Sequence, residues 1–171
     1  MIDDDGQIKY VMTIRRQVRM LLPLIAKNSI LTALCWIILE NFDFSFFLMI
    51  SIFFLIDVLP TLIIHIQYYC FSKDIEITVD LLNKTVEYNK KEDRFIIGFA
   101  EVTEINYYVA FVKPTGAHSF GEYRYIELVV PNTQNILITC LMNENIELRI
   151  PNQLKKPLNK IGKTFPLIKS N

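Results

Sequence analysis

The stretch FSFFLMISIFFLIDVLPTLIIHIQYYCF, from Phe44 to Phe71, decides how the rest of the chain can be arranged. From Phe44 to Ile64 it contains a single charged side chain, Asp57. A helix of about 20 apolar residues, rising about 1.5 Å per residue, is long enough to cross the hydrocarbon core of a bilayer. We therefore expect residues 44–66 to form a transmembrane helix.

A second apolar run precedes this segment. Met20 to Leu39 has the length of a membrane span, although Lys27 and Asn28 interrupt it. The acidic connector that follows, Glu40 to Asp43, is so short that the two runs should pair as an antiparallel helical hairpin. The expected organisation is a cytoplasmic basic arm at 1–19, the hairpin at 20–71, a β domain at 72–150 and a basic, proline-containing tail at 151–171.

Basic residues predict the orientation of this hairpin. Five of them precede or open the first run and Lys73 follows the second, whereas the connector has none. Basic residues favour the cytoplasmic side, so both termini should be cytoplasmic and the protein a multi-pass component of the cell membrane. The three scattered cysteines do not form a disulfide framework, which agrees with a reducing compartment.

Asp57 lies deep in the expected span, where a charge costs about 2.5–3.5 kcal/mol. Fifteen residues separate it from Phe42 in the turn, and the same count backward from Phe42 reaches Lys27. The two charges should face each other as an intramembrane pair, with Asn28 as a further hydrogen-bonding group. The alternatives are a proton path that includes His65 and an interaction with another protein's helix; the apolar outer half of both helices argues against the path.

The residues before the first span, Ile8 to Leu22, place apolar side chains roughly on one side. An interfacial helix is one interpretation of this pattern, and a solvated basic arm that only sets topology is the other. In the first case the arginines would contact anionic headgroups. The expected anionic-lipid contacts are Arg15, Arg16 and Arg19 from the arm, with Lys155, Lys156 and Lys160 from the tail.

From Asp74 onward the hydrophobic period changes to two, which is typical of β-strands. No crossover helix is evident in this half, so the strands should form an antiparallel sheet that closes or stacks on itself. The predicted fold class is an α+β membrane protein, a helical hairpin followed by an antiparallel barrel or sandwich. About seven strands are expected, at 75–79, 86–88, 95–99, 104–112, 123–130, 136–141 and 146–150.

Three passages in this half resemble bacterial membrane proteins that carry a pleckstrin-homology-like (PH-like) domain. They are NKTVE at 83–87, FAEVTEI at 99–105 and ILITCL at 136–141, and the resemblance covers roughly Ile75 to Leu141. It implies a bent seven-stranded barrel or sandwich plugged at one end by a C-terminal helix. Pro151, Pro157 and Pro166 depart from that pattern and make a long plugging helix doubtful.

Searches for chemistry give little. His65 and His118 lack ligand partners at metal-binding spacing, so no metal site, cofactor or enzyme activity is expected. The loop GAHSFG has neither the strand nor the helix that a phosphate-binding loop requires, and no small-molecule substrate is evident. From Ser72 on, thirteen basic residues against twelve acidic ones make nucleic acid an unsuitable partner. The first hairpin offers Lys84 against Asp80 and Glu87, too little for specific inositol-phosphate recognition.

Aromatic residues mark one expected hairpin of the β domain. They occur on both faces of its strands, and only one face can turn toward the core, so we expect the other to form a protein-binding surface. A barrel rim with tyrosine hydroxyls in water is the plainer interpretation. The residues concerned are Tyr107, Tyr108, Phe111, Tyr123 and Tyr125.

These features predict a non-enzymatic protein that the lipid bilayer anchors and whose cytoplasmic PH-like domain recognises an unknown protein partner. The alternative is an immunity protein that neutralises a toxin acting at or near the same membrane.

Overall fold

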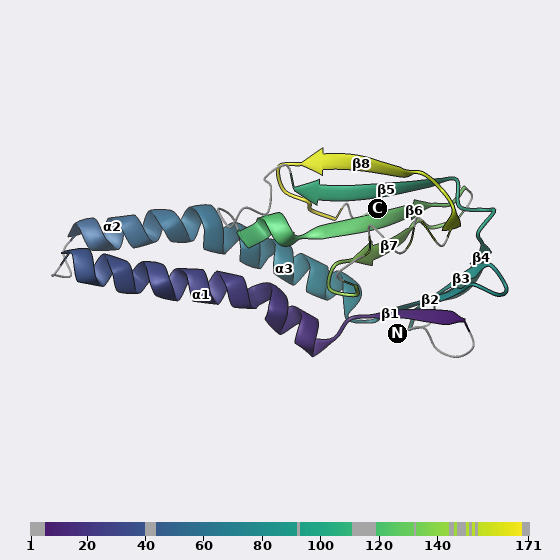
Figure 1. Ribbon diagram of the computed structural model, residues 1–171, viewed down its shortest axis with the longest axis horizontal. Helices are drawn as coiled ribbons and strands as arrows, with labels where there is room; N and C mark the ends of the chain where they lie inside the picture. The colour runs from purple at the N-terminus through teal and green to yellow at the C-terminus, as the bar shows by residue number, and fades with distance from the viewer. Residues whose placement is uncertain are drawn as a thin grey trace.

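The computed structural model describes residues 6–39, 44–91, 93–110, 119–131, 133–143, 146, 150, 152 and 154–168. Two long helices lie side by side, and their far ends project from the β-strands (Figure 1). The first is α1 (Ile14–Leu39). The second consists of α2 (Phe44–Phe53), a π-helical turn η1 (Phe54–Val58) and α3 (Leu59–Ser72).

The π-helical turn lies where Pro60 interrupts the regular hydrogen-bond pattern of the second helix. Proline has no backbone N–H to donate, so one carbonyl of the preceding turn loses its usual partner. The backbone N–H of Leu59 donates to the carbonyl of Phe54, and the Thr61 hydroxyl donates to the carbonyl of Asp57 at 2.6 Å. The helix therefore continues through the proline, and Asp57 lies within the widened turn.

One sheet is antiparallel in the order β1-β2-β3-β4. Its strands are β1 (Gln7–Val11), β2 (Ile75–Asp80), β3 (Thr85–Lys90) and β4 (Asp93–Gly98). Because β1 pairs along its whole length with β2, the helices are inserted between two neighbouring strands of one sheet. The prediction of a separate arm at 1–19 is wrong for this strand, whose buried Ile8 and Tyr10 belong to the β core.

The other sheet has the order β7-β6-β5-β8. Its strands are β5 (Glu104–Ala110), β6 (Arg124–Val129), β7 (Ile136–Thr139) and β8 (Leu158–Lys163). Strand β8 pairs with β5 in parallel, so the fully antiparallel sheet expected from the sequence is a mixed one. The segment 151–171, which was expected to be a tail, therefore contains an edge strand that pairs with β5.

The inner faces of the two sheets pack against each other around one apolar core. Ile146, Ile150 and Leu154 also belong to this core, and they are helical and almost fully buried. Their spacing of four residues places them on one face of a helix. The strand predicted at 146–150 is therefore wrong, because Ile146 and Ile150 are helical. The helical plug that these residues form with Leu154 ends before Pro157, so it is not the long helix that the prolines disfavour.

A third layer covers the outer face of the second sheet. Helix α3 packs there through Ile64 and Tyr68 against Tyr123, Tyr125 and other residues of a second apolar cluster. The hydroxyls of Ser72 and Thr139 are hydrogen-bonded at 2.8 Å and tie the end of α3 to β7. Six of the seven predicted strands are confirmed, and the described residues add two more, β1 and β8.

Candidate functional site

Asp57 is the junction between the helices and the β domain. Its carboxylate is almost fully buried, with 1% of the residue exposed. Lys27 Nζ lies 3.1 Å from Oδ2, so the structure brings together the two charges whose pairing was predicted. Asn28 is not part of this group, because its amide donates to the carbonyl of Leu24 in its own helix at 2.7 Å.

Ser119 provides two further hydrogen bonds to Asp57. Its backbone N–H donates to Oδ1 at 2.8 Å and its hydroxyl donates to Oδ2 at 3.0 Å. Asp57 thereby holds the start of a short 3-10 helix, η2 (Ser119–Glu122), against the helix pair. Sequence reasoning missed this partner because no periodicity relates a loop residue to a helix position 62 residues earlier.

The predicted aromatic surface is mostly buried, which corrects that expectation. Tyr107 faces the core between the sheets, whereas Tyr123 and Tyr125 face α3, and all three are less than 7% exposed. The reason is that the last turns of α3, which follow the most apolar part of the helix, cover the sheet face that was expected to be free. Tyr108 is half-buried, and Phe111 lies outside the described residues.

The tyrosine hydroxyls are used within the fold. Tyr68 donates to the carbonyl of Pro166 at 2.7 Å, and Tyr125 donates to that of Leu167 at 3.3 Å. The hydroxyl of Tyr123 is hydrogen-bonded to His65 Nδ1 at 2.8 Å. Burial raises the pKa of Tyr123 and of Tyr125, so these groups stay protonated in the folded protein.

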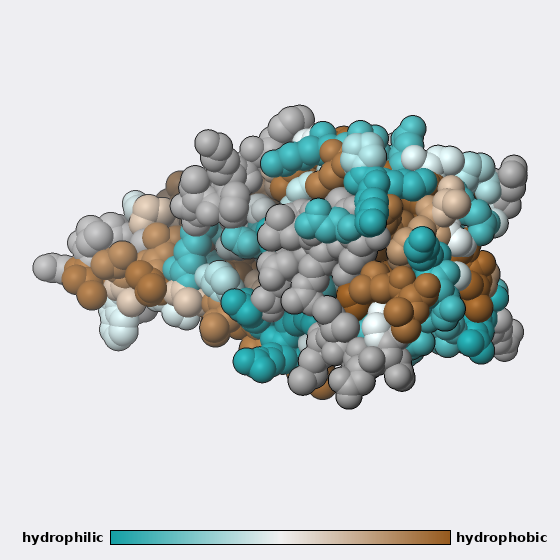
Figure 2. All heavy atoms as spheres, turned by 45° about the vertical axis from the view of Figure 1, so that its right-hand side comes forward, coloured by the Kyte–Doolittle hydropathy of each residue, from teal (hydrophilic) through white to brown (hydrophobic). Residues whose placement is uncertain are grey.

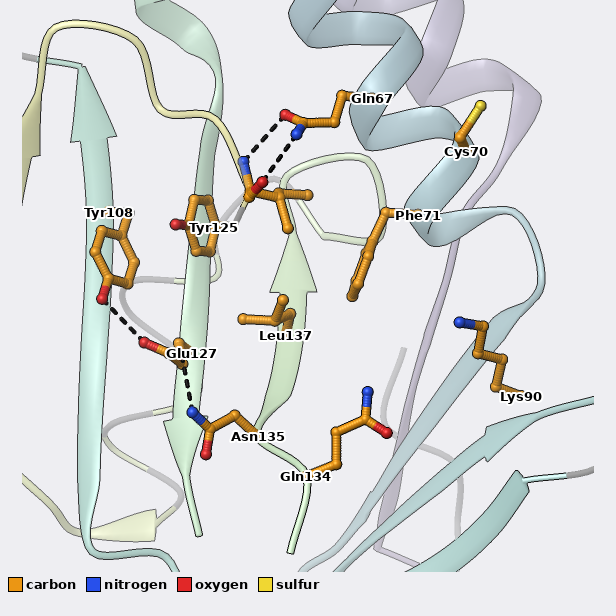
Figure 3. A pocket seen from close by; sticks show the side chains of 11 residues that line it. Gln67, Cys70, Phe71, Lys90, Tyr108, Tyr125, Glu127, Gln134, Asn135 and Leu137 are labelled. Atoms are coloured by element: carbon orange, nitrogen blue, oxygen red, sulfur yellow. Dashed lines mark hydrogen bonds between the residues drawn. The ribbon is translucent and has the colours of Figure 1, made fainter. Parts of the chain in front are cut away.

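A cleft of about 430 Å³ remains at the edge of this covered face (Figure 3). Helix α3 forms one wall and β5, β6 and β7 form the floor, with Lys90 of β3 on the side opposite the tyrosines. Its lining is part apolar and part polar. The lining residues are Gln67, Cys70, Phe71, Lys90, Tyr108, Tyr125, Glu127, Gln134, Asn135, Leu137 and Ile168.

Hydrogen bonds fix the acidic group of this cleft. Glu127 accepts one bond from the Tyr108 hydroxyl at 2.9 Å and another from the Asn135 amide at 2.9 Å. Lys163 Nζ lies 4.1 Å from the centroid of the Tyr108 ring, a cation–π distance. Burial, followed by the hydrogen bond with Glu127, raises the pKa of Tyr108 to about 12. Tyr108 is thus a neutral donor at physiological pH.

Gln67 recognises a backbone segment at the other end of the cleft. Its side-chain amide donates to the carbonyl of Ile168 at 2.8 Å and accepts from the Ile168 N–H at 3.0 Å. A primary amide that contacts both groups of one residue imitates the pairing of a neighbouring strand. Gln67 thereby holds the chain at Ile168 against α3.

The predicted anionic-lipid contacts do not lie together. Arg15 and Arg19 are exposed near the start of α1, and Arg16 donates to the carbonyl of Val11 at 3.0 Å. Lys155 and Lys156 line a hollow with Leu81 of the β2–β3 turn, at the end of the domain away from the projecting helices. Lys160 is exposed within β8.

The projecting part of the helix pair carries many apolar side chains on the face that Figure 2 shows. Among the described residues, one helix is long and apolar enough to cross a membrane, Phe44–Ser72, and its most apolar stretch of 18 residues has a mean hydropathy of 2.5. Ile37, Phe47, Leu55 and Ile56 are each more than half exposed. A water-facing surface of this kind is unfavourable unless something apolar covers it.

The described residues hold no cluster of His, Cys, Asp and Glu that could bind a metal ion. The polar side chains that line the cleft are amide, hydroxyl, carboxylate and ammonium groups, which form hydrogen bonds.

A plugged sandwich of two four-stranded sheets with a lateral cleft defines a β-domain binding module. A family model described as PH domain matches residues 9–149, and the chain belongs to this family. The match begins in β1 and includes both helices, which agrees with their insertion between β1 and β2. No curated protein and no solved structure matches the chain.

Proposed function

We propose that this chain is a membrane-anchored binding protein without catalytic activity, whose PH domain recognises a protein partner at the membrane face. The observation that carries the proposal is the apolar helix Phe44–Ser72, which emerges from a β domain with most side chains of its far half exposed. Transfer of apolar surface from water into hydrocarbon is favourable by about 25 cal/mol per Å². A bilayer is the environment that this surface fits.

The β domain constrains how the helices would enter a bilayer. Strand β1 precedes α1, β2 follows α3, and the two strands are hydrogen-bonded neighbours. The chain therefore enters and leaves on the same face of the membrane. The basic residues Lys9, Arg15, Arg16 and Arg19 lie at this end of α1, which favours the cytoplasmic face.

The cleft beside α3 is the proposed partner site. It replaces the predicted tyrosine surface as a whole, because Tyr107 and Tyr123 are buried, and of its described members only Tyr108 and Tyr125 line the cleft. Gln134 offers an exposed amide at the edge of the cleft, while Phe71 and Leu137 provide apolar contacts. The exposed amide of Gln134 beside these apolar contacts suits a peptide segment, whose backbone needs hydrogen bonds and whose side chains need pockets.

Site-specific photo-crosslinking in intact membranes tests this proposal. A photoreactive residue at Gln134 or Lys90 should capture a discrete partner, because both positions line the cleft. The matched control is Lys84, an exposed residue of the β2–β3 turn at the other end of the domain. We expect the band captured at Gln134 to disappear with Lys90→Glu.

Capture at Lys84 as strong as at Gln134, or no capture at either cleft position, would reject the cleft as the partner site. The immunity alternative stays a prediction, since no feature of the described residues favours it specifically.

A further inference from the structure

An apolar patch on the β domain continues the surface of the second helix. On α3, Leu59 and Ile63 are 38% and 53% exposed. Phe165 and Leu167, from the segment after β8, are both 42% exposed and lie beside them. Together with Pro60 and Ile64 these side chains line a shallow, almost wholly apolar hollow of about 250 Å³.

The segment that carries Phe165 and Leu167 is held by its backbone. Its carbonyls accept hydrogen bonds from Tyr68, Tyr125 and Gln67, and the Ile168 N–H donates to Gln67. Phe165 also packs on Phe120 of η2, with ring centroids 5.1 Å apart. The polar groups thus point inward, and the apolar side chains face outward with those of α3. Hydrocarbon offers no hydrogen-bonding partners, so backbone groups placed there must be hydrogen-bonded within the protein.

Helix geometry gives the depth of this patch. Counted from Phe44, Leu59 lies about 22 Å along the helix and Ile63 about 28 Å, at a rise of about 1.5 Å per residue. A hydrocarbon core is about 30 Å thick. If the helix crosses the bilayer from Phe44, both residues are still within the core, in the leaflet nearer the β domain.

We propose that residues 164–168, with the adjoining face of α3, are immersed among the acyl chains of the near leaflet, so the PH domain dips into the membrane. This inference rests on the proposed membrane anchor and adds a second lipid contact to it. The same depth places Asp57 and its partner Ser119 within the core, where Lys27 and Ser119 supply the polar contacts that lipid cannot.

Depth-dependent fluorescence quenching tests the proposal. The full chain, with its native cysteines replaced, receives one new cysteine labelled with an environment-sensitive dye and is reconstituted in phosphatidylcholine–phosphatidylglycerol vesicles. The test positions are Phe165→Cys and, as an independent repeat, Leu167→Cys. Ser45→Cys reports on the far end of the helix, and Leu82→Cys, an exposed apolar residue of the β2–β3 turn, is the control in water.

We expect the dye at Phe165 and Leu167 to emit at shorter wavelength than at Leu82, and to lose emission with lipids that carry a nitroxide near the headgroup. Leu82 should show no loss. Quenching at Ser45 with Phe165 and Leu167 behaving like Leu82 would overturn this inference and leave the anchor intact. Absence of quenching at all four positions would overturn the proposed anchor itself.

Discussion

Asp57 connects three parts of the chain that are far apart in sequence. It pairs with Lys27 of α1, lies in the π-helical turn of the second helix and accepts two hydrogen bonds from Ser119 of the β domain. The pairing with Lys27 followed from counting residues on either side of one turn. The contact with Ser119 could not be predicted, because it depends on how the sheet lies against the helices.

Asp57→Asn should lower the free energy of unfolding by about 2–3 kcal/mol, since it leaves Lys27 without its counter-charge and places an amide N–H₂ against donors. Urea unfolding in detergent micelles would measure the loss. Adding Lys27→Met should recover part of it, because the buried charge is then removed as well. A double variant as unstable as the sum of the single ones would show that the two side chains are not coupled.

Tyr108 should make the free energy of unfolding fall at alkaline pH. Its pKa is raised from about 10 to about 12, so between these values the unfolded chain has lost a proton that the folded protein keeps. The contribution of Tyr108 to the free energy of unfolding is therefore complete below pH 10 and is lost as the pH rises through 12. Tyr108→Phe should show a shallower fall over this range in unfolding experiments monitored by circular dichroism. Parallel curves for the two proteins would contradict the assignment.

At the scale of elements, alternation of apolar and polar residues predicted the strands that it marks clearly, β2 to β7. It failed for β1 and β8, which lie in segments rich in basic residues and are strands because a neighbour accepts them at a sheet edge. It failed for the tyrosines too: alternation indicates that a strand has two faces, but not that a helix from another part of the chain covers the second one.

The helical plug offers a direct test of the corrected C-terminal region. Ile150 is fully buried in the core between the sheets, so Ile150→Ala should lower the free energy of unfolding by about 2–5 kcal/mol. Leu82→Ala is the matched control, since Leu82 is 76% exposed, and should change stability by no more than about 0.5 kcal/mol. Equal, small effects would mean that residue 150 faces solvent.

At the scale of the whole molecule, the apolar helix and the β1–β2 pairing both favour a helix pair that projects from one end of the β domain. The sequence predicts an apolar helical anchor from length and composition, and the β1–β2 pairing requires both ends of the helix pair to lie at one end of the β domain. The site was harder to anticipate, because the cleft forms only where α3, the second sheet and the C-terminal segment meet.

Extraction of membranes with alkaline carbonate tests membrane anchoring most directly. Treatment of this kind releases proteins held by charge or by headgroup recognition, whereas an apolar helix within hydrocarbon stays. We predict that the full chain remains in the membrane pellet. The chain would also remain there after Arg15→Ala and Arg19→Ala, since those side chains contribute surface attraction alone. Release of the unmodified chain into the supernatant as a folded protein would contradict the account.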